Sequence, residues 1–230
     1  MEYDGSRKNE FIAMLEGMTG QEIANTVNKL NSLMAYYRCA ILETETKFKV
    51  LDQQFSLSHE RNPITAIESR IKSIPSIQEK LLRDGVTPSV DNIEKHLNDV
   101  AGVRVICAFI DDIYMLADCL ISQDDITLIK RKDYIKEPKE NGYRSLHLVI
   151  EIPIFLYNEK RKVKVEVQLR TIAMESWANL EHRLRYKKEL DRETLDRTSD
   201  ILNECAVLSG LLDEKMQLAR DIIDGTENKK

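Results

Sequence analysis

The chain has 230 residues, enough for one large or two small domains with a well-buried core. Hydrophobic residues make up 42% and charged residues 32%, a composition typical of globular proteins. The formal net charge of −5 argues against a general nucleic-acid binder and against a membrane-surface protein, so we expect neither DNA nor a membrane among its partners.

The cysteines and the N-terminus favour a cytoplasmic protein. The four cysteines are widely spaced and form no CxxC pair, which favours reduced thiols over disulfides or a zinc site. The first ten residues have no apolar core and are not predicted to be a signal peptide. No stretch approaches the ~18 apolar residues that span a bilayer.

Helical spacing of apolar residues from Gln21 to Phe55 predicts one long helix, and a break near Glu43–Thr46 is also considered. The polar break that follows leads into a predicted strand over Ile64–Lys72. Two short helices are then expected, one with Pro75 and Ser76 in its first turn and its end at Gly85, and one over Asp91–Asn98.

The middle of the chain alternates strands and helices. The Val- and Ile-rich run Ala101–Phe109 predicts a buried central strand. A helix over Asp111–Ser122, a strand over Ile126–Lys132 and a loop over Tyr134–Gly142 follow. Two further strands, Tyr143–Ile150 and Val163–Arg170, are predicted to form a hairpin, in which Pro153 suggests that the first strand bends or ends early.

The last two predicted elements are helices, over Thr171–Lys188 and Arg192–Asp224. Together these elements predict an α+β fold: a mixed β-sheet of about five strands flanked by long N- and C-terminal helices. A heptad-like stripe follows the last helix, formed by Ile201, Cys205, Leu208, Leu212, Ala219 and Ile222. It indicates either packing on its own domain or a self-association surface.

Two neighbouring strands are predicted to present polar side chains on one face. In Val163–Arg170 apolar and polar residues alternate, which places four polar side chains together: Lys164, Glu166, Gln168 and Arg170. Taken alone, this pattern is typical of a sheet with one solvated side. Ser145 and His147 add a hydroxyl and an imidazole from the strand before, and the combined set is typical of a functional site.

The loop before these strands is basic. Six cations lie between residues 130 and 144: Lys130, Arg131, Lys132, Lys136, Lys139 and Arg144. Phosphates bind such groups, although the interleaved acids make a solvated loop the better interpretation on charge alone. Tyr143, beside the flexible Gly142, is well placed to stack on a base.

A second acid and a buried cation extend this pattern. Asp99 lies just before the buried strand, and with Glu166 it would form the two-carboxylate site that Mg²⁺ prefers. Arg104 lies inside the apolar strand, where it either forms an internal ion pair or contacts a nucleobase or phosphate. The strand itself leaves both alternatives open.

These features together resemble the synthetase domain of the RelA/SpoT family, and the short chain is similar to its small alarmone synthetases. The resemblance spans Asn62–Lys188. Four motifs carry it: Arg70-Ile71-Lys72 with Ser76 and Lys80; Asp99-Val100-Ala101-Gly102-Val103-Arg104; the loop from Tyr134, which ends in Asn141-Gly142-Tyr143-Arg144-Ser145-Leu146-His147; and Glu166-Val167-Gln168-Leu169-Arg170-Thr171. A fifth, Trp177-Ala178-Asn179-Leu180-Glu181-His182, follows at the expected distance.

The family transfers the β,γ-pyrophosphate of ATP to the 3′-hydroxyl of GTP or GDP and makes pppGpp or ppGpp, the alarmones of the stringent response. The resemblance implies that Asp99 and Glu166 are catalytic and bind Mg²⁺, and that Glu166 accepts the proton of the attacking hydroxyl. It implies ATP contacts from five residues: Arg70, Lys72, Ser76, Lys80 and Arg104. It implies GTP or GDP contacts from six: Lys132, Lys139, Asn141, Tyr143, His147 and Gln168.

The resemblance also implies an organisation: an N-terminal helical extension (1–60), a synthetase domain of nucleotidyltransferase-like fold (61–190) and a C-terminal helix (191–230). The stripe on the last helix predicts a homo-oligomer, and the resemblance to small synthetases makes a tetramer the expected state. The hydrolase half of long family members is absent, and none of the four histidines forms an HD pair, so synthesis without hydrolysis is expected. The chain departs from the family pattern at Glu137, and at Glu175 and Ser176 before Trp177.

Three other functions are compatible with these residues. A catalytically silent protein of the same fold would sense guanine nucleotides, and a different nucleotidyltransferase would transfer AMP and release pyrophosphate. A purely structural role would depend on the terminal helices alone. The preference among GTP, GDP and GMP, and regulation by an alarmone, RNA or a metal, are left open by the residues.

Overall fold

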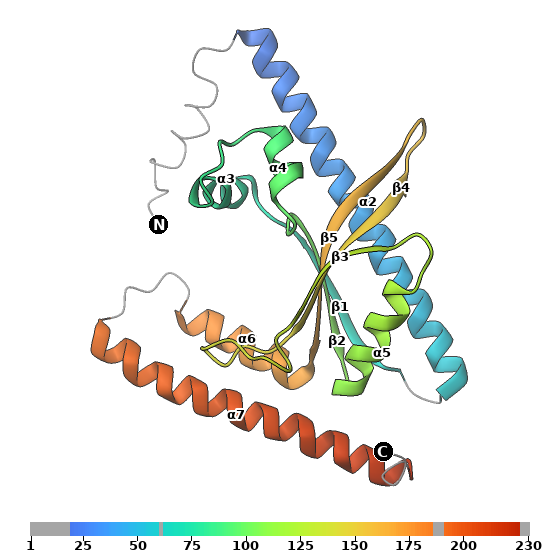
Figure 1. The fold of residues 1–230 in the computed structure, drawn as a ribbon, viewed down its shortest axis with the longest axis vertical. Helices are drawn as coiled ribbons and strands as arrows, with labels where there is room; N and C mark the ends of the chain where they lie inside the picture. The colour runs from blue at the N-terminus through green and yellow to red at the C-terminus, as the bar shows by residue number, and fades with distance from the viewer. Residues whose placement is uncertain (1–18, 60–61, 186–190, 226–230) are drawn as a thin grey trace.

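The computed structural model describes residues 19–59, 62–185 and 191–225. Its elements are, in chain order, α2 (Gly20–His59), β1 (Ile64–Ile71), α3 (Ile74–Arg83), α4 (Val90–His96), β2 (Ala101–Cys107), α5 (Ile110–Ile121), β3 (Thr127–Asp133), β4 (Leu146–Phe155), β5 (Lys160–Thr171), α6 (Ile172–Arg185) and α7 (Arg192–Ile223). The strands form one sheet in the order β1-β2-β5-β4-β3 (Figure 1). Because β2 and β5 are parallel and the other neighbours antiparallel, the predicted α+β fold with a mixed five-stranded sheet is confirmed.

One face of the sheet packs against α2 and α5. Helix α2 contacts four of the strands, and α5 contacts β2 and β5. The alternate residues of β5 that join this core are buried: Val163, Val165, Val167 and Leu169. From α2, Tyr37, Ala40 and Phe48 enter the same core. Burial of these apolar surfaces fixes which face of the sheet remains polar.

Helix α2 is continuous from Gly20 to His59, so the break considered near Glu43–Thr46 does not occur. Thr44 is completely buried, and its hydroxyl donates to the carbonyl of Ala40 at 2.8 Å. The hydroxyl of Thr46 likewise donates four residues back, to Leu42. Each polar group is therefore satisfied inside the helix, and the threonines do not end it.

Pro153 does not end β4 before its hairpin turn, so the predicted early end of the strand is wrong. Strand β4 continues to Phe155, and Pro153 is paired with Lys162 of β5. The other neighbour, β3, pairs with β4 only as far as Glu151. Pro153 therefore lies where one side of β4 has no partner strand, and a missing N–H costs little there.

Helix boundaries differ from the predictions by a few residues, and caps explain the clearest cases. Helix α3 begins at Ile74 rather than Pro75, because the Ser73 side chain caps it by accepting a hydrogen bond from the Ser76 N–H. Helix α4 begins at Val90 after a similar cap by Ser89. The segment 143–145 is loop rather than strand. The predicted helix end at Lys188 lies outside the described residues.

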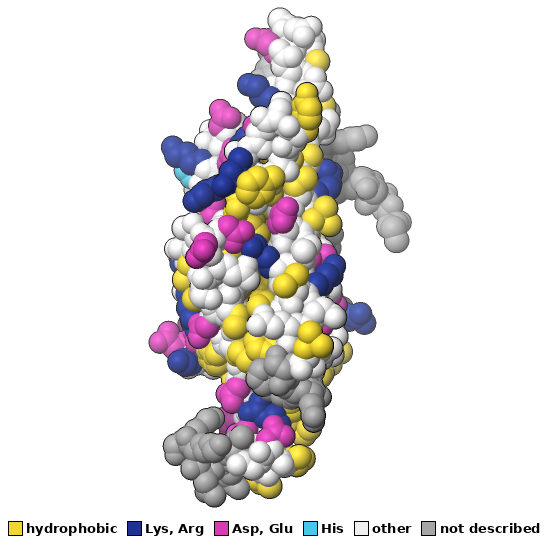
Figure 2. All heavy atoms as spheres, turned by 90° about the vertical axis from the view of Figure 1, so that its right-hand side faces the viewer, with side chains coloured by type: hydrophobic (Ala, Val, Ile, Leu, Met, Phe, Trp, Pro, Cys, Tyr) yellow, Lys and Arg dark blue, Asp and Glu magenta, His cyan; other side chains and the backbone are white. Residues whose placement is uncertain are grey.

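Helix α7 packs against α6 and α5 by a face that includes the buried Ala206 and Asp213. All six residues of the predicted stripe are instead exposed. Figure 2 shows the side of the molecule that carries α2 and α5, where acidic and basic side chains are intermingled with hydrophobic ones. Within the described residues, no helix is long and apolar enough to cross a membrane.

Candidate active site

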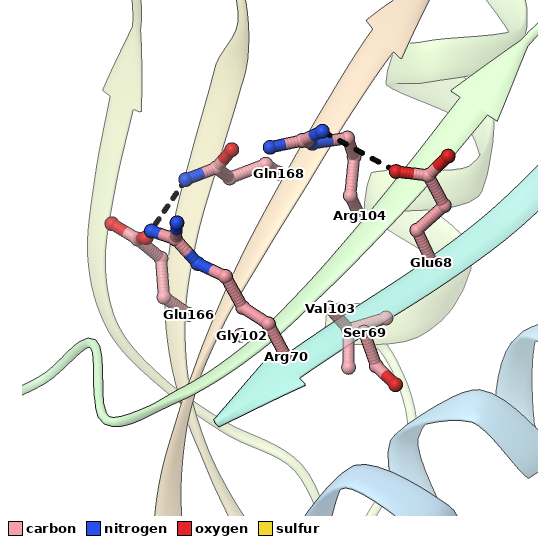
Figure 3. A pocket seen from close by; sticks show the side chains of 8 residues that line it. All are labelled: Glu68, Ser69, Arg70, Gly102, Val103, Arg104, Glu166 and Gln168. Atoms are coloured by element: carbon pink, nitrogen blue, oxygen red, sulfur yellow. Dashed lines mark hydrogen bonds and ion pairs between the residues drawn. The ribbon is translucent and has the colours of Figure 1, made fainter. Parts of the chain in front are cut away.

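The face of the sheet turned away from α2 collects the predicted polar residues. Gly102 is paired with Glu166, and Arg104 with Gln168, across the parallel strands β2 and β5. On the other side of β2, Arg70 is paired with Gly102. These side chains line one pocket (Figure 3). The polar face predicted for residues 163–170 is therefore present, and three strands contribute to it.

The two arginines predicted to contact ATP are fixed to different degrees. Arg104 Nη1 donates to Glu175 Oε1 at 2.7 Å and to Glu68 Oε2 at 3.3 Å, so it does form an internal ion pair. Its side chain is still 24% exposed at the pocket. Arg70 is exposed, lies along Gly102 and bonds to no side chain in the described part of the chain. The pocket thus has one anchored guanidinium and one that can adjust.

Asp99 lies just before β2, between two lysines from different elements. Its Oδ2 is 2.5 Å from Lys72 Nζ, which follows β1, and 2.9 Å from Lys80 Nζ on α3. Burial opposes ionisation of Asp99, but the two lysines outweigh it and hold the pKa of this carboxyl below its ordinary value. The second oxygen, Oδ1, is buried and has no partner among the described residues. Ser76 lies in the first turn of α3, where backbone N–H groups favour anions.

Glu166 is the carboxylate in the middle of the polar face. Its Oε2 accepts from Gln168 Nε2 at 2.8 Å, and its Oε1 lies 3.4 Å from His147 Nδ1. Burial raises the pKa of Glu166, but His147 and Gln168 outweigh burial, and the pKa lies below its ordinary value. The negative charge of Asp99 raises the pKa of Glu166. The two carboxylates are therefore close enough to influence each other.

Tyr143 connects the basic loop with the strand residues. Its hydroxyl lies 2.8 Å from His147 Nε2 and accepts from Arg170 Nη2 at 2.5 Å. The ammonium of Lys139 lies 4.7 Å from the centre of the Tyr143 ring. Since Lys139 is exposed, it can leave the ring when another group stacks there. Tyr134 packs edge-on against both Tyr143 and His147.

The other two predicted acceptor residues have less direct positions. Asn141 Oδ1 accepts a hydrogen bond from the Tyr143 backbone N–H at 3.3 Å, so it shapes the loop. Lys132 is exposed on β3 and is paired with His147 in the sheet. Its ammonium lies 5.9 Å from the centre of the Tyr134 ring. Both residues are therefore beside the Tyr143–His147 pair.

Helix α7 supports this loop from behind. Gly142 has φ of +83°, and a Cβ there would lie 2.4 Å from the Ala206 side chain, so only glycine fits. Arg144 Nη1 forms an ion pair with the buried Asp213 of α7 at 3.2 Å. Burial raises the pKa of Asp213 more than Arg144 and Thr171 lower it. The loop position therefore depends on the docking of α7.

Three residues have roles that the sequence did not indicate. Glu175, noted only as a departure from the family pattern, binds Arg104 and Arg170, and its partner Arg104 is 71 positions away. Arg170 is buried and donates to Tyr143 and Gln168. Lys164 donates to the carbonyls of Glu94 and Lys95 at 3.2 Å, so it caps the end of α4 rather than facing the pocket. The contacts of Glu175 with Arg104 and of Lys164 with Glu94 span 71 and 70 positions, and no local pattern signals them.

Comparisons with known proteins agree with this geometry. A family model described as "Region found in RelA / SpoT proteins" matches residues 69–191. The chain is 45% identical to GTP pyrophosphokinase YwaC of Bacillus subtilis over 186 residues, which are 81% of this chain and 87% of the relative. It is 38% identical to GTP pyrophosphokinase YjbM of the same bacterium over 151 residues, 66% of this chain and 70% of the relative.

Solved structures agree as well. Small alarmone synthetase 2 from B. subtilis has a TM-score of 0.74 and 41% identity, over 83% of this chain and 97% of its own. Small alarmone synthetase 1 from the same bacterium, solved with its product pppGpp, has a TM-score of 0.75 and 34% identity, over 84% and 97%. On the family match and these identities, the chain belongs to the RelA/SpoT family.

Proposed function

We propose that this chain is a GTP pyrophosphokinase that transfers the β,γ-pyrophosphate of ATP to the 3′-hydroxyl of GTP or GDP. Its relatives at 45% and 38% identity are named GTP pyrophosphokinases. The observation that carries the proposal is the position of Glu166. It lines the pocket that holds Arg70 and Arg104, and it also contacts His147, the partner of Tyr143. One carboxylate thus adjoins both a donor pocket and an acceptor loop.

On the donor side, we propose that adenine lies between Arg70 and Arg104, since guanidinium planes stack on nucleobases. Lys72 and Lys80 would bind the ATP phosphates, with Ser76 at the start of α3 beside them. Without nucleotide, these two lysines neutralise Asp99. As the phosphates bind the ammonium groups, the carboxylate of Asp99 becomes available to a metal ion.

On the acceptor side, guanine would stack on Tyr143. Lys132 and Lys139 supply positive charge beside this ring for the phosphates of GTP or GDP. His147 and Gln168 both contact Glu166, so a nucleotide held by them presents its ribose to that carboxylate. Asn141 completes the proposed acceptor site by holding the Tyr143 backbone.

Asp99 and Glu166 fit a magnesium ion. Both carboxylates have a lowered pKa, and Asp99 Oδ1 is buried with no described partner. Mg²⁺ is usually held by one or two carboxylates together with substrate phosphates. When bound, it would offset the negative charge of the transferred group.

The proposed chemistry uses Glu166 as the base. The acceptor 3′-oxygen bonds to the β-phosphorus of ATP while the bond from that phosphorus to the α,β-bridging oxygen breaks. The proton of the hydroxyl passes to Glu166, and AMP leaves with the bridging oxygen. Much of the rate enhancement then comes from positioning two nucleotides against each other.

Incubation with labelled ATP, GTP and Mg²⁺ tests the proposal. We expect AMP and pppGpp; GDP and GMP as alternative acceptors give the order of preference. Absence of a 3′-pyrophosphorylated product would favour the silent guanine-nucleotide sensor. Release of pyrophosphate instead of AMP would favour a different nucleotidyltransferase.

The proposal includes synthesis without hydrolysis, so the protein is expected to leave added pppGpp intact. It also includes a cytoplasmic location, where ATP and GTP are available, and the division into 1–60, 61–190 and 191–230.

Tyr143→Ala is expected to raise the dissociation constant for GTP about 10- to 100-fold, since base–aromatic stacking contributes roughly 1–3 kcal/mol. The affinity for ATP is expected to change less than about twofold, because Tyr143 does not line the donor pocket. Titration calorimetry with each nucleotide alone measures both constants. Tyr157→Ala is the control, since Tyr157 is 101% exposed in the hairpin turn. Equal losses for ATP and GTP would contradict the assignment.

We further propose a homo-oligomer, with a tetramer as the expected state. The exposed stripe of α7 includes Leu208 at 63% and Leu212 at 53% exposure, and contiguous apolar surface of this kind marks interfaces. Light scattering is expected to give about four times the chain mass of 26.6 kDa. The double variant Leu208→Glu/Leu212→Glu should lower that mass. A wild-type monomer would refute the proposal.

A further inference from the structure

Glu175 is a buried carboxylate that the proposed chemistry does not use. It lies in the first turn of α6 and is 6% exposed. Its two oxygens bind different arginines: Oε1 lies 2.7 Å from Arg104 Nη1, and Oε2 lies 2.8 Å from Arg170 Nη1. Asn179 Nδ2 also donates to Oε1 at 2.8 Å. A buried carboxylate is retained at such a position only if it is well paired.

The two arginines contact different parts of the site, Arg104 the donor pocket and Arg170 the acceptor loop. Arg104 lines the pocket proposed for adenine. Arg170 donates from Nη2 to the Tyr143 hydroxyl and to Gln168 Oε1, at 2.5 and 2.9 Å. Its guanidinium also lies 5.0 Å from the centre of the Tyr143 ring. A continuous chain of charged hydrogen bonds therefore runs from the donor pocket through Glu175 to the acceptor loop.

We propose that Glu175 is a positioning residue that sets the orientation of Arg104 for the donor nucleotide and, through Arg170, of Tyr143 for the acceptor. This inference rests on the proposed function, because it takes the two nucleotide sites from there. It adds a physical link between them, supplied by one side chain of α6 that need not touch either nucleotide.

The remaining contacts of the arginines are too few to replace Glu175. The Nε atoms of Arg104 and Arg170 are buried and have no partner among the described residues. Without Glu175, Arg104 keeps the longer contact of 3.3 Å to Glu68, whose side chain is 56% exposed. Arg170 loses the only carboxylate paired with it in the described part of the chain. Both guanidiniums would then turn toward other acceptors or toward solvent.

Glu175→Gln tests the inference. Glutamine keeps the shape but replaces one oxygen by an NH₂ group, which must face an arginine or Asn179. The amide has no negative charge to hold either guanidinium, and its NH₂ group cannot accept from the arginine that it faces, so ATP and GTP binding are each expected to weaken by about tenfold. Calorimetry with each nucleotide alone gives these constants without turnover. A role limited to stability would lower the melting temperature and leave both constants unchanged.

Double variants add a readout that general destabilisation cannot imitate. The double variant Arg104→Ala/Glu175→Gln is expected to bind ATP no more weakly than Arg104→Ala alone. Likewise, Tyr143→Phe/Glu175→Gln is expected to bind GTP little more weakly than Tyr143→Phe alone. Asn179→Ala is the matched control, because it removes a bond to the same oxygen and leaves both arginines paired. Ile113→Val, in the core on α5, controls for lost stability alone.

Arg170→Lys serves if Glu175→Gln does not fold. A lysine keeps the charge beside Glu175, but its single ammonium does not reproduce the fork that also reaches Tyr143. Binding of GTP should weaken severalfold and binding of ATP should not. Unchanged GTP affinity in this variant would overturn the inference, because the route from Glu175 to the acceptor loop runs through Arg170.

The remaining outcomes separate the inference from the proposed function. Unchanged affinities for both nucleotides in folded Glu175→Gln, or losses that multiply in the double variants, overturn the inference alone. If the wild-type protein binds both nucleotides but forms no pppGpp, the proposed function fails while the binding data still decide the role of Glu175. If it binds neither nucleotide, both are overturned.

Discussion

Glu166→Gln is expected to lower the rate of pyrophosphate transfer by about 10³-fold or more while the protein stays folded. General-base catalysis typically contributes about 10²- to 10⁴-fold, and an amide neither accepts the proton nor supplies negative charge to a metal. The fold should persist because glutamine keeps the shape and an oxygen that can accept from Gln168. Single-turnover formation of labelled pppGpp measures the rate, and thermal melting followed by circular dichroism checks the fold.

Glu151→Gln is the control for this experiment. Glu151 lies on the neighbouring strand β4, outside the pocket, and its Oε2 forms an ion pair with Lys162 Nζ at 3.7 Å. Its substitution removes the same charge from the same sheet, and activity should remain within about twofold of wild type. If Glu166→Gln keeps a tenth of the wild-type rate, the loss is smaller than removal of a general base would cause. Such a result would exclude Glu166 from that role.

The polar face of β5 could be predicted because its signal is local. Alternation with a period of two places Glu166 and Gln168 on one side whatever the strand packs against. The pattern could not say which side was solvated, since a sheet with one wet face has the same alternation. That decision comes from α2, whose Tyr37 and Phe48 bury the apolar side. Parallel pairing with β2 then brings Arg104 beside Gln168.

The network around Glu175 could not be predicted from any period or motif. Its contact with Arg104 joins a strand to a helix 71 positions later, and the orientation of α6 decides which side chain arrives. The same reason applies to Lys164, whose alternation suggests a site residue but whose ammonium meets the end of α4. Both side chains are long, and strand periodicity fixes only the direction in which they start.

Helix α2 and strand β4 are both continuous where threonines and a proline suggested an interruption. Thr44 satisfies its hydroxyl within α2, and Pro153 lies beside an unpaired stretch of β4. The Thr44 partner is local, since Ala40 lies four residues earlier, whereas the extent of β3 beside Pro153 is set by sheet pairing that the sequence does not reveal. The residues near the chemistry were less affected, because their identity was carried by charged motifs rather than by element boundaries.

Asp99→Asn is expected to lower the turnover rate at least about 100-fold at ordinary Mg²⁺ concentrations, since it removes one of the two proposed metal ligands. Raising the Mg²⁺ concentration should restore part of this activity, because Glu166 remains as a ligand and as the base. The same increase should not rescue Glu166→Gln. Titration of both variants with Mg²⁺ at saturating nucleotide therefore separates metal binding from proton transfer.

Stability provides a second test of Asp99. Its pKa is lower in the folded chain, so the ionised carboxylate stabilises the fold above its unfolded pKa. This contribution is lost as the pH falls through the folded pKa. The wild type should therefore unfold at higher urea than Asp99→Asn at pH 7, and the difference should vanish in acid. Asp125→Asn, which breaks an ion pair with Lys47 on the surface, is the control.

The Mg²⁺ titration and the stability test address different roles of the carboxylates. In the titration, equal rescue of Asp99→Asn and Glu166→Gln by Mg²⁺ would mean that Glu166 only binds the metal and is not the base.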